Sequence, residues 1–158
     1  MDTTVQRDVA ASAERVWEIM TDLEGSPEVL SGVERVERLD SGEGFGVGTR
    51  WRETRTMHGK QATEEMAVTA MDPGRSYTVE ADSRGAHYLS VLQVEPLGAD
   101  RSRMTMTFGG EPSGAAAKVL AATVGRLFAP ATRKALQRDL DDIAAHAEAT
   151  PGAQPSTP

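Results

Sequence analysis

The chain has 158 residues, of which 39% are hydrophobic, and a formal net charge of −7 without any cysteine. This length supports one hydrophobic core, so we expect one domain over residues 1–149 and a disordered, proline-rich tail over 150–158. The negative charge, with no basic stripe, argues against nucleic acid as a partner, and the lack of cysteine excludes disulfides and thiolate metal sites. No stretch of about 18 apolar residues could span a membrane, and no secretory signal is visible, so we expect a cytoplasmic protein.

The first part of the chain predicts one strand and two short helices. Residues 3–10 alternate polar and apolar side chains, as a strand does. Ser12 can cap a helix that Gly25 ends, and Ser26 with Pro27 can start a second one. The expected buried face of the first helix consists of Val16, Trp17, Ile19, Met20 and Leu23.

From residue 33 onwards the period of hydrophobicity changes to that of strands. We expect further strands at 33–39, 49–57, 61–71, 77–82, 88–94 and 103–108. Between them lie turn signals such as the glycine-rich segment 40–48, the sequence Asp72-Pro73-Gly74 and a hairpin loop at 96–100. Strands joined by short turns pair antiparallel, and a sheet of about seven such strands will curl.

A long helix is predicted from Pro112 to Glu148, because apolar residues recur there at spacings of three and four. Pro130 lies inside this pattern and predicts a kink at 127–129. The helix is long enough to lie across the concave face of the sheet, which gives an α+β fold. The charged residues between Arg133 and Asp142 are spaced like a solvated helix face, with an interaction surface as the alternative.

Local phrases along the chain resemble a known family. They read DVAASAERVWEIMTDLEGSPEVLSGVERVERLD, GVGTRW, AMDPGRSYTVE and EPLGADRSRMTMTF. Their order and spacing resemble the START or SRPBCC helix-grip superfamily, and within it the bacterial polyketide cyclase/dehydrase-like group. The resemblance implies a helix-grip fold, in which a curved antiparallel sheet wraps around the C-terminal helix and encloses a cavity. Members bind lipids, sterols, polyketides or plant hormones, and some catalyse cyclisation or dehydration, but the family has no universal catalytic motif.

Strand alternation indicates which side chains would face that cavity, if the resemblance holds. A wall rich in methionine suits an irregular apolar ligand, although each residue could equally be ordinary core. The expected ligand-binding residues are Trp51, Met57, Met66, Tyr77, Leu92, Met104, Met106, Phe108, Leu120, Val124 and Phe128.

A pair of charges lies on the strand face that carries Trp51. Glu53 and Arg55 share this face, and if they are buried each can serve as the partner of the other. In the functional interpretation Arg55 holds a ligand carboxylate or enolate oxygen, Glu53 or Glu64 acts as a base, and the hydroxyl of Tyr88 orients or protonates an oxygen. In the alternative interpretation a β-bulge reverses the strand and leaves Glu53 and Arg55 as a surface pair.

We expect no cofactor and no metal, because His58, His87 and His146 are scattered and match no metal-binding spacing. The segment 44–48 lacks the features of a phosphate loop, but it could act as a lid over the cavity. The primary hypothesis is binding of a small hydrophobic, polyketide- or lipid-like molecule by a monomer or homodimer. The alternative is a polyketide cyclase/dehydrase-type enzyme, and a chaperone-activator role is weaker still.

Overall fold

The computed structural model describes residues 3–57, 59–83, 86–112 and 115–149. Within these ranges the side chains of residues 57, 83, 111–112 and 115–129 lie outside the description, and the predicted tail at 150–158 lies outside the described residues. The backbone is helical at 127–129, where the kink was predicted, and α3 includes Pro130. The elements are β1 (Thr3–Val9), α1 (Ala13–Met20), α2 (Ser26–Val29), β2 (Val33–Arg38), β3 (Arg50–Met57), β4 (Lys60–Asp72), β5 (Ser76–Ser83), β6 (Ala86–Gly98), β7 (Arg101–Pro112) and α3 (Ala115–Ala149).

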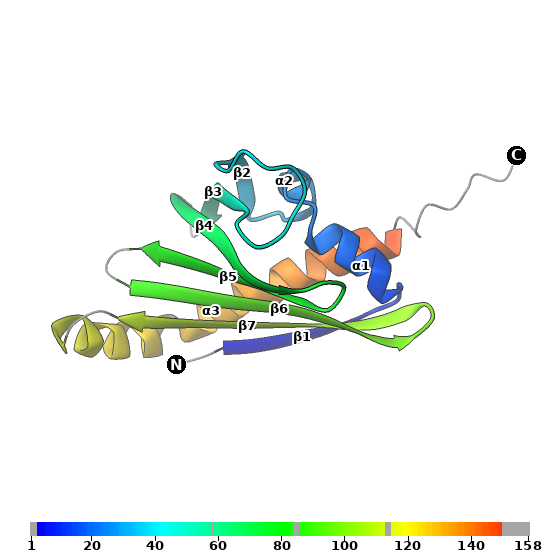
Figure 1. The fold of residues 1–158 in the computed structure, drawn as a ribbon. Coiled ribbons are helices and arrows are strands. Elements are labelled where there is room, and N and C mark those ends of the chain that lie inside the picture. The colour runs from blue at the N-terminus through cyan, green and yellow to red at the C-terminus, as the bar shows by residue number, and fades with distance from the viewer. Residues whose placement is uncertain (1–2, 58, 84–85, 113–114, 150–158) are drawn as a thin grey trace, which may run out of the picture.

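The strands form one antiparallel sheet in the order β1-β7-β6-β5-β4-β3-β2. Each strand from β2 to β7 pairs with its neighbour in the chain, while β1 returns to the far edge and pairs with β7, where Val5 lies opposite Met106. Helix α3 runs along one side of the curved sheet, and the short helices α1 and α2 lie at the end near the C-terminal half of α3 (Figure 1). The predicted α+β helix-grip architecture is therefore confirmed.

The hairpin between β6 and β7 is longer than the sequence predicts. Strand β6 continues to Gly98 and β7 begins at Arg101, so only residues 99 and 100 of the expected loop at 96–100 form the turn, with a register shift between Pro96 and Gly98. Proline cannot donate a hydrogen bond to the sheet, but a bulge tolerates it, so the strand persists to Gly98. The predicted loop was therefore too long, because proline and glycine were interpreted as a stop signal.

Helix α1 begins as predicted but ends before Gly25. The hydroxyl of Ser12 accepts a hydrogen bond from the backbone N–H of Arg15 at 3.1 Å. At the other end the hydroxyl of Thr21 donates to the carbonyl of Trp17, and the carboxylate of Asp22 accepts from the N–H of Gly25 at 3.2 Å. These side-chain hydrogen bonds to the backbone compete with the backbone hydrogen bonds of a longer helix, and α1 therefore ends at Met20.

The main core lies where α1 and α3 pack on β1, β6 and β7. Its α3 face repeats at helical spacing and consists of Leu136, Leu140, Ile143, Ala144 and Ala147. These side chains meet Val9 of β1 and Val16 of α1 in one cluster of buried residues. Within the described part of the chain, no helix is both long and apolar enough to cross a membrane.

Replacing Leu140 with alanine should lower the free energy of unfolding by about 2–5 kcal/mol, because the deletion leaves a cavity in the core. Leu140 is 1% exposed, whereas Leu89 on β6 is 40% exposed and provides a matched control. Urea unfolding should show the Leu89→Ala change to be within about 0.5 kcal/mol of the wild type. Equal losses for the two variants would contradict the packing of α3 on the sheet.

Candidate functional site

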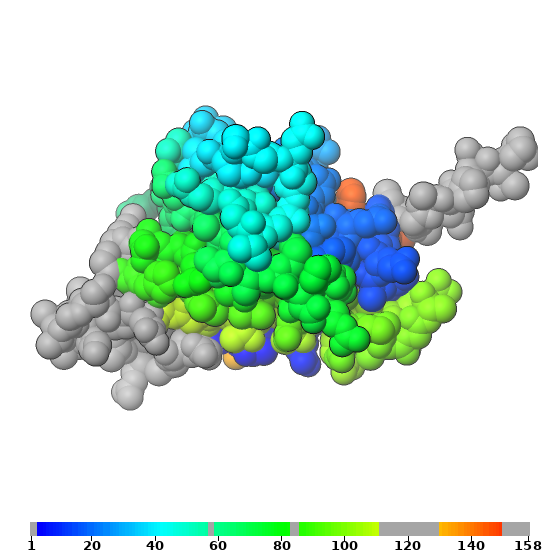
Figure 2. Space-filling view, viewed as in Figure 1, coloured from blue at the N-terminus to red at the C-terminus, as the bar shows by residue number. Residues whose placement is uncertain are grey.

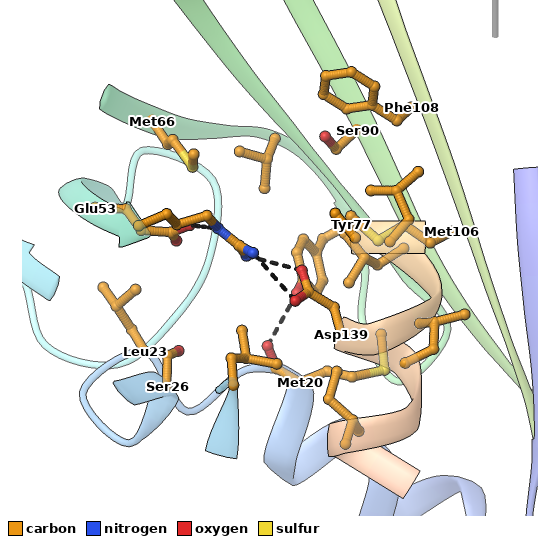
Figure 3. Close-up of a pocket in the computed structure, with 18 of the residues that line it drawn as sticks. Met20, Leu23, Ser26, Glu53, Met66, Tyr77, Ser90, Met106, Phe108 and Asp139 are labelled. Atoms are coloured by element: carbon orange, nitrogen blue, oxygen red, sulfur yellow. Dashed lines mark hydrogen bonds and ion pairs between the residues drawn. The ribbon is translucent and has the colours of Figure 1, made fainter. Parts of the chain in front are cut away.

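A cavity of about 390 Å³ lies between the sheet, α2 and the C-terminal half of α3. Figure 3 shows its walls, with Leu23 and Ser26 on the side of the short helices and Met66, Ser90 and Phe108 on the strands. Of the predicted ligand-binding residues, the structure places six in this wall: Trp51, Met66, Tyr77, Leu92, Met106 and Phe108. The side chains of Met57, Leu120, Val124 and Phe128 lie outside the described residues.

Met104 does not line the cavity, in contrast to its prediction. It shares a strand face with Met106 but lies opposite Val94, at the end of β7 where α1 also contacts the sheet. There it is 1% exposed and belongs to the solid core with Val16. Strand alternation predicts on which side of the sheet a side chain lies. The position of α1 then decides whether that side chain packs in the core or lines the cavity.

The charged pair of β3 faces the cavity. The register between β3 and β4 is regular from Arg50 to Met57, so no bulge reverses the strand here, and Glu53 and Arg55 both lie in the cavity wall. The Nε atom of Arg55 donates a hydrogen bond to Glu53, as the sequence suggested. Glu53 also accepts a hydrogen bond from the indole nitrogen of Trp51 at 3.3 Å.

The principal partner of Arg55 is a residue that the sequence analysis missed. Asp139 of α3 accepts two hydrogen bonds from the guanidinium, 3.1 Å from Nη1 to Oδ1 and 2.8 Å from Nη2 to Oδ2 (Figure 3). Asp139 is 6% exposed, so the prediction of a solvated face is wrong at this position. A signal existed, because Asp139 lies three residues after Leu136 and four before Ile143, on the apolar face of the helix.

This buried charge trio consists of Glu53, Arg55 and Asp139. Burial opposes the charge of Arg55, but the carboxylates of Asp139 and Glu53 outweigh this effect and raise the pKa of the guanidinium, which stays protonated. Burial also raises the pKa of the Asp139 carboxyl, more than the contact with Arg55 lowers it. One cation between two carboxylates gives the ionised trio a net negative charge.

Tyr77 is also part of the wall, but its polar atom is occupied. Its hydroxyl donates to the carbonyl of Met20 at 3.0 Å, and burial, with Glu53 and Asp139 nearby, raises the pKa of the phenol. Tyr77 therefore stays neutral and joins β5 to α1. Its role is to hold the wall in place.

Several polar side chains of the wall have no side-chain partner among the described residues. Glu64, Tyr88 and Ser90 are among them: they line the cavity and form no side-chain hydrogen bond or ion pair with a described residue. The ring of Tyr88 stacks on Phe108 with centroids 5.5 Å apart, and it lies close to Gly110, where a Cβ atom would be 3.0 Å from the ring. Glycine at position 110 therefore makes room for this aromatic pair.

The loop between β2 and β3 contributes an aromatic residue that the sequence analysis did not select. Phe45 lies in the cavity wall and packs edge-on against Tyr77, with ring centroids 4.8 Å apart. Arg38 anchors the loop by donating to the carbonyl of Gly44 and pairing with Glu24. The cyan segment that includes this loop forms the upper margin of the molecule in Figure 2. This contact supports the suggestion that the loop covers the cavity.

No group of side chains suited to a metal ion occurs among the described residues. His87 instead lies between Asp82 and Glu80, whose hydrogen bonds raise the pKa of its ring. His58 lies outside the described residues.

The sheet, the long helix and the cavity between them define a START-type, helix-grip domain. The chain belongs to the family described as polyketide cyclase/dehydrase and lipid transport, whose model matches residues 1–148. Comparison with curated protein sequences gave no match.

Solved structures support the same fold at low sequence identity. The ZhuI aromatase/cyclase from Streptomyces sp. R1128 has a TM-score of 0.76 at 20% identity, with 99% of both chains covered. Truncated norcoclaurine synthase from Thalictrum flavum has a TM-score of 0.71 at 19% identity, covering 93% of this chain and 92% of that one. A START superfamily protein from Mycobacterium smegmatis has a TM-score of 0.67 at 18% identity, covering 94% of each chain.

Replacing Asp139 with alanine should lower the free energy of unfolding by about 3 kcal/mol, because Arg55 would lose its bidentate partner in a buried place. The control is Asp141→Ala on the same helix, where the side chains of Asp141 and its partner Arg7 are 47% and 39% exposed. An exposed pair contributes at most about 1 kcal/mol. If urea unfolding gives the same loss for both variants, the buried contact between α3 and β3 is not formed in solution.

Proposed function

We propose that the chain binds a small hydrophobic ligand, polyketide- or lipid-like, in the cavity between the sheet and α3. The observation that carries this proposal is the cavity itself, whose 390 Å³ are walled largely by apolar side chains with a few polar groups among them. Binding sites for small molecules have this composition, since apolar walls supply affinity and polar groups fix orientation. The membership of the family supports the same class of function.

The wall is suited to an adaptable fit. Met20, Met66 and Met106 present flexible thioether side chains from α1, β4 and β7. The stacked rings of Tyr88 and Phe108 add a flat apolar surface to the wall. A ligand that carries aromatic rings or a bent chain would make contact with both.

The first experiment is to incubate the purified protein with an extract of its source organism and to identify the retained molecules by native mass spectrometry. We expect an unaltered hydrophobic molecule to be retained by the wild type. Conversion of a retained intermediate would favour an enzyme, and a cavity that stays empty would contradict the binding proposal and favour the chaperone-activator hypothesis. The proposed setting remains the bacterial cytoplasm, with the chain acting as a monomer or homodimer.

Filling the cavity should abolish this retention. Ser90→Phe would place a ring inside the wall, whereas Leu89→Phe puts the same ring on the neighbouring residue, which is exposed. Native mass spectrometry should show loss of the ligand from the Ser90 variant only, with both variants folded by circular dichroism. Equal retention by the two would place the ligand elsewhere.

Tyr88 is a better probe of the polar contacts than Arg55. Arg55→Ala would leave Glu53 and Asp139 without a counter-charge, so it would damage folding as well as binding. Tyr88→Phe removes only a hydroxyl without a partner among the described residues. We expect it to weaken ligand affinity about fivefold, the effect of losing one hydrogen bond, with little change in unfolding free energy.

A second candidate function is a cyclase or dehydrase, and the carboxylate of Glu64 favours it. Glu64 lies directly opposite Glu53 across the strand pair, lines the cavity and forms no ion pair with any described residue. Glu53 is occupied by Arg55 and Trp51, so Glu64 is the better base. It could remove a proton next to a ketone, and the resulting enolate could attack a second carbonyl while Tyr88 donates a proton to the new alkoxide.

Under this second proposal Glu64→Gln should lower the rate of cyclisation of a linear poly-β-ketone by about 100-fold, the usual contribution of a general base. Glu65→Gln is the matched control, because Glu65 is exposed and pairs with Arg52 on the other face of the strand. The assay follows the absorbance of the aromatic product. Similar rates for the two variants, or a rate equal to that without protein, would exclude Glu64 as the base.

A further inference from the structure

The charges of the cavity wall point to a narrower class of ligand. We propose that the cavity selects a hydrophobic ligand whose polar groups are uncharged hydroxyls, and that it rejects ligands ending in a free carboxylate, such as fatty acids. This inference rests on the binding function proposed above. It follows from the balance of charge among the described residues of the wall and from the hydrogen bonds that occupy the guanidinium of Arg55.

The wall has more acidic than basic groups. Among the described residues that line the cavity, the carboxylates are Glu53, Glu64 and Asp139, and the one cation is Arg55. The polar groups that remain are hydroxyls, which carry no charge in the neutral range. An anionic ligand would therefore enter a site that already has a net negative charge, and it would lose its hydration there.

Arg55 is not free to compensate an incoming carboxylate. Its Nε atom binds Glu53, and Nη1 and Nη2 bind the two oxygens of Asp139. The backbone of the α2–β2 connection also lies close by, since a Cβ atom at Gly32 would be 3.4 Å from Nη1. A ligand carboxylate could displace Asp139 from the guanidinium, but this would leave the buried Asp139 without its partner. Otherwise the ligand carboxylate would become a third anion around one guanidinium.

A ligand hydroxyl suits the same wall. Glu64 offers carboxylate oxygens that accept no hydrogen bond from the described residues, and hydrogen bonds to an ionised acceptor are stronger than those between neutral groups. The hydroxyls of Tyr88 and Ser90 can donate or accept, so they can serve a ligand hydroxyl or carbonyl. A fused-ring phenol could place its ring against Tyr88 and Phe108 and direct its hydroxyl to this carboxylate.

The test compares two probes of similar shape, 2-naphthol and 2-naphthoate, by isothermal titration calorimetry at pH 7.5, where only the second is an anion. The wild type should bind 2-naphthol at least about tenfold more tightly, which corresponds to 1.4 kcal/mol. A neutral probe is also intrinsically more hydrophobic than an anion. The decisive quantity is therefore the ratio of the affinity for 2-naphthol to the affinity for 2-naphthoate, and how this ratio changes in variants. Glu64→Gln and Asp139→Asn each remove one negative charge and should each lower the ratio at least about threefold, as expected when a like charge is removed nearby.

Glu65→Gln is the control for these variants, because it removes a negative charge from the exposed face of the same strand. Its ratio should equal that of the wild type, and circular dichroism should show all variants folded. A ratio below tenfold in the wild type, or a ratio unchanged by both Glu64→Gln and Asp139→Asn, would overturn the inference while 2-naphthol binding still supports the binding function. If neither probe binds the wild type, both the inference and the binding function fail.

Discussion

The contact on which the rest of the site depends is the ion pair between Arg55 and Asp139. It joins β3, a strand near one edge of the sheet, to the long helix α3, and it lies in the wall of the cavity between these two layers. Glu53 adds a second carboxylate from the same strand as Arg55. A charge removed from water is stable only with partners, so this trio fixes the position of α3 relative to β3.

The same contact gives the cavity its electrostatic character. At the other end of the sheet, α1 and α3 close over β1 and β7, and residues such as Met104 and Val16 fill the space completely. Toward β3 lies the cavity, whose largely apolar wall also includes the charged side chains of Glu53, Arg55 and Asp139. The solid core and the cavity proposed to bind a ligand thus lie toward two ends of one sheet.

The likeness to an aromatase/cyclase, a norcoclaurine synthase and a START superfamily protein concerns the backbone, since identity is 18–20%. One fold with a cavity between sheet and helix can host binding or catalysis, and the side chains of the cavity decide between them. Here Glu64 and Tyr88 have no side-chain partner among the described residues and are the groups that the proposed proton transfer would use, while Arg55 and Tyr77 are engaged in hydrogen bonds within the wall. This division of roles is a property of the individual chain and not of the fold.

The sequence by itself determined the order of elements and the antiparallel sheet, because these depend on local periodicity, which each strand and helix carries in its own residues. It left two orientations of β3 open, and the regular register between β3 and β4 decided between them. It also identified Glu53 and Arg55 as a pair. Only the tertiary structure decided that Asp139 completes the pair, that Met104 belongs to the core, and that Phe45 lines the cavity. Each of these features depends on contacts between segments that are far apart in the chain. The spacing of residues along one helix or strand predicts which of its faces is buried, but it does not predict which distant element will pack against that face.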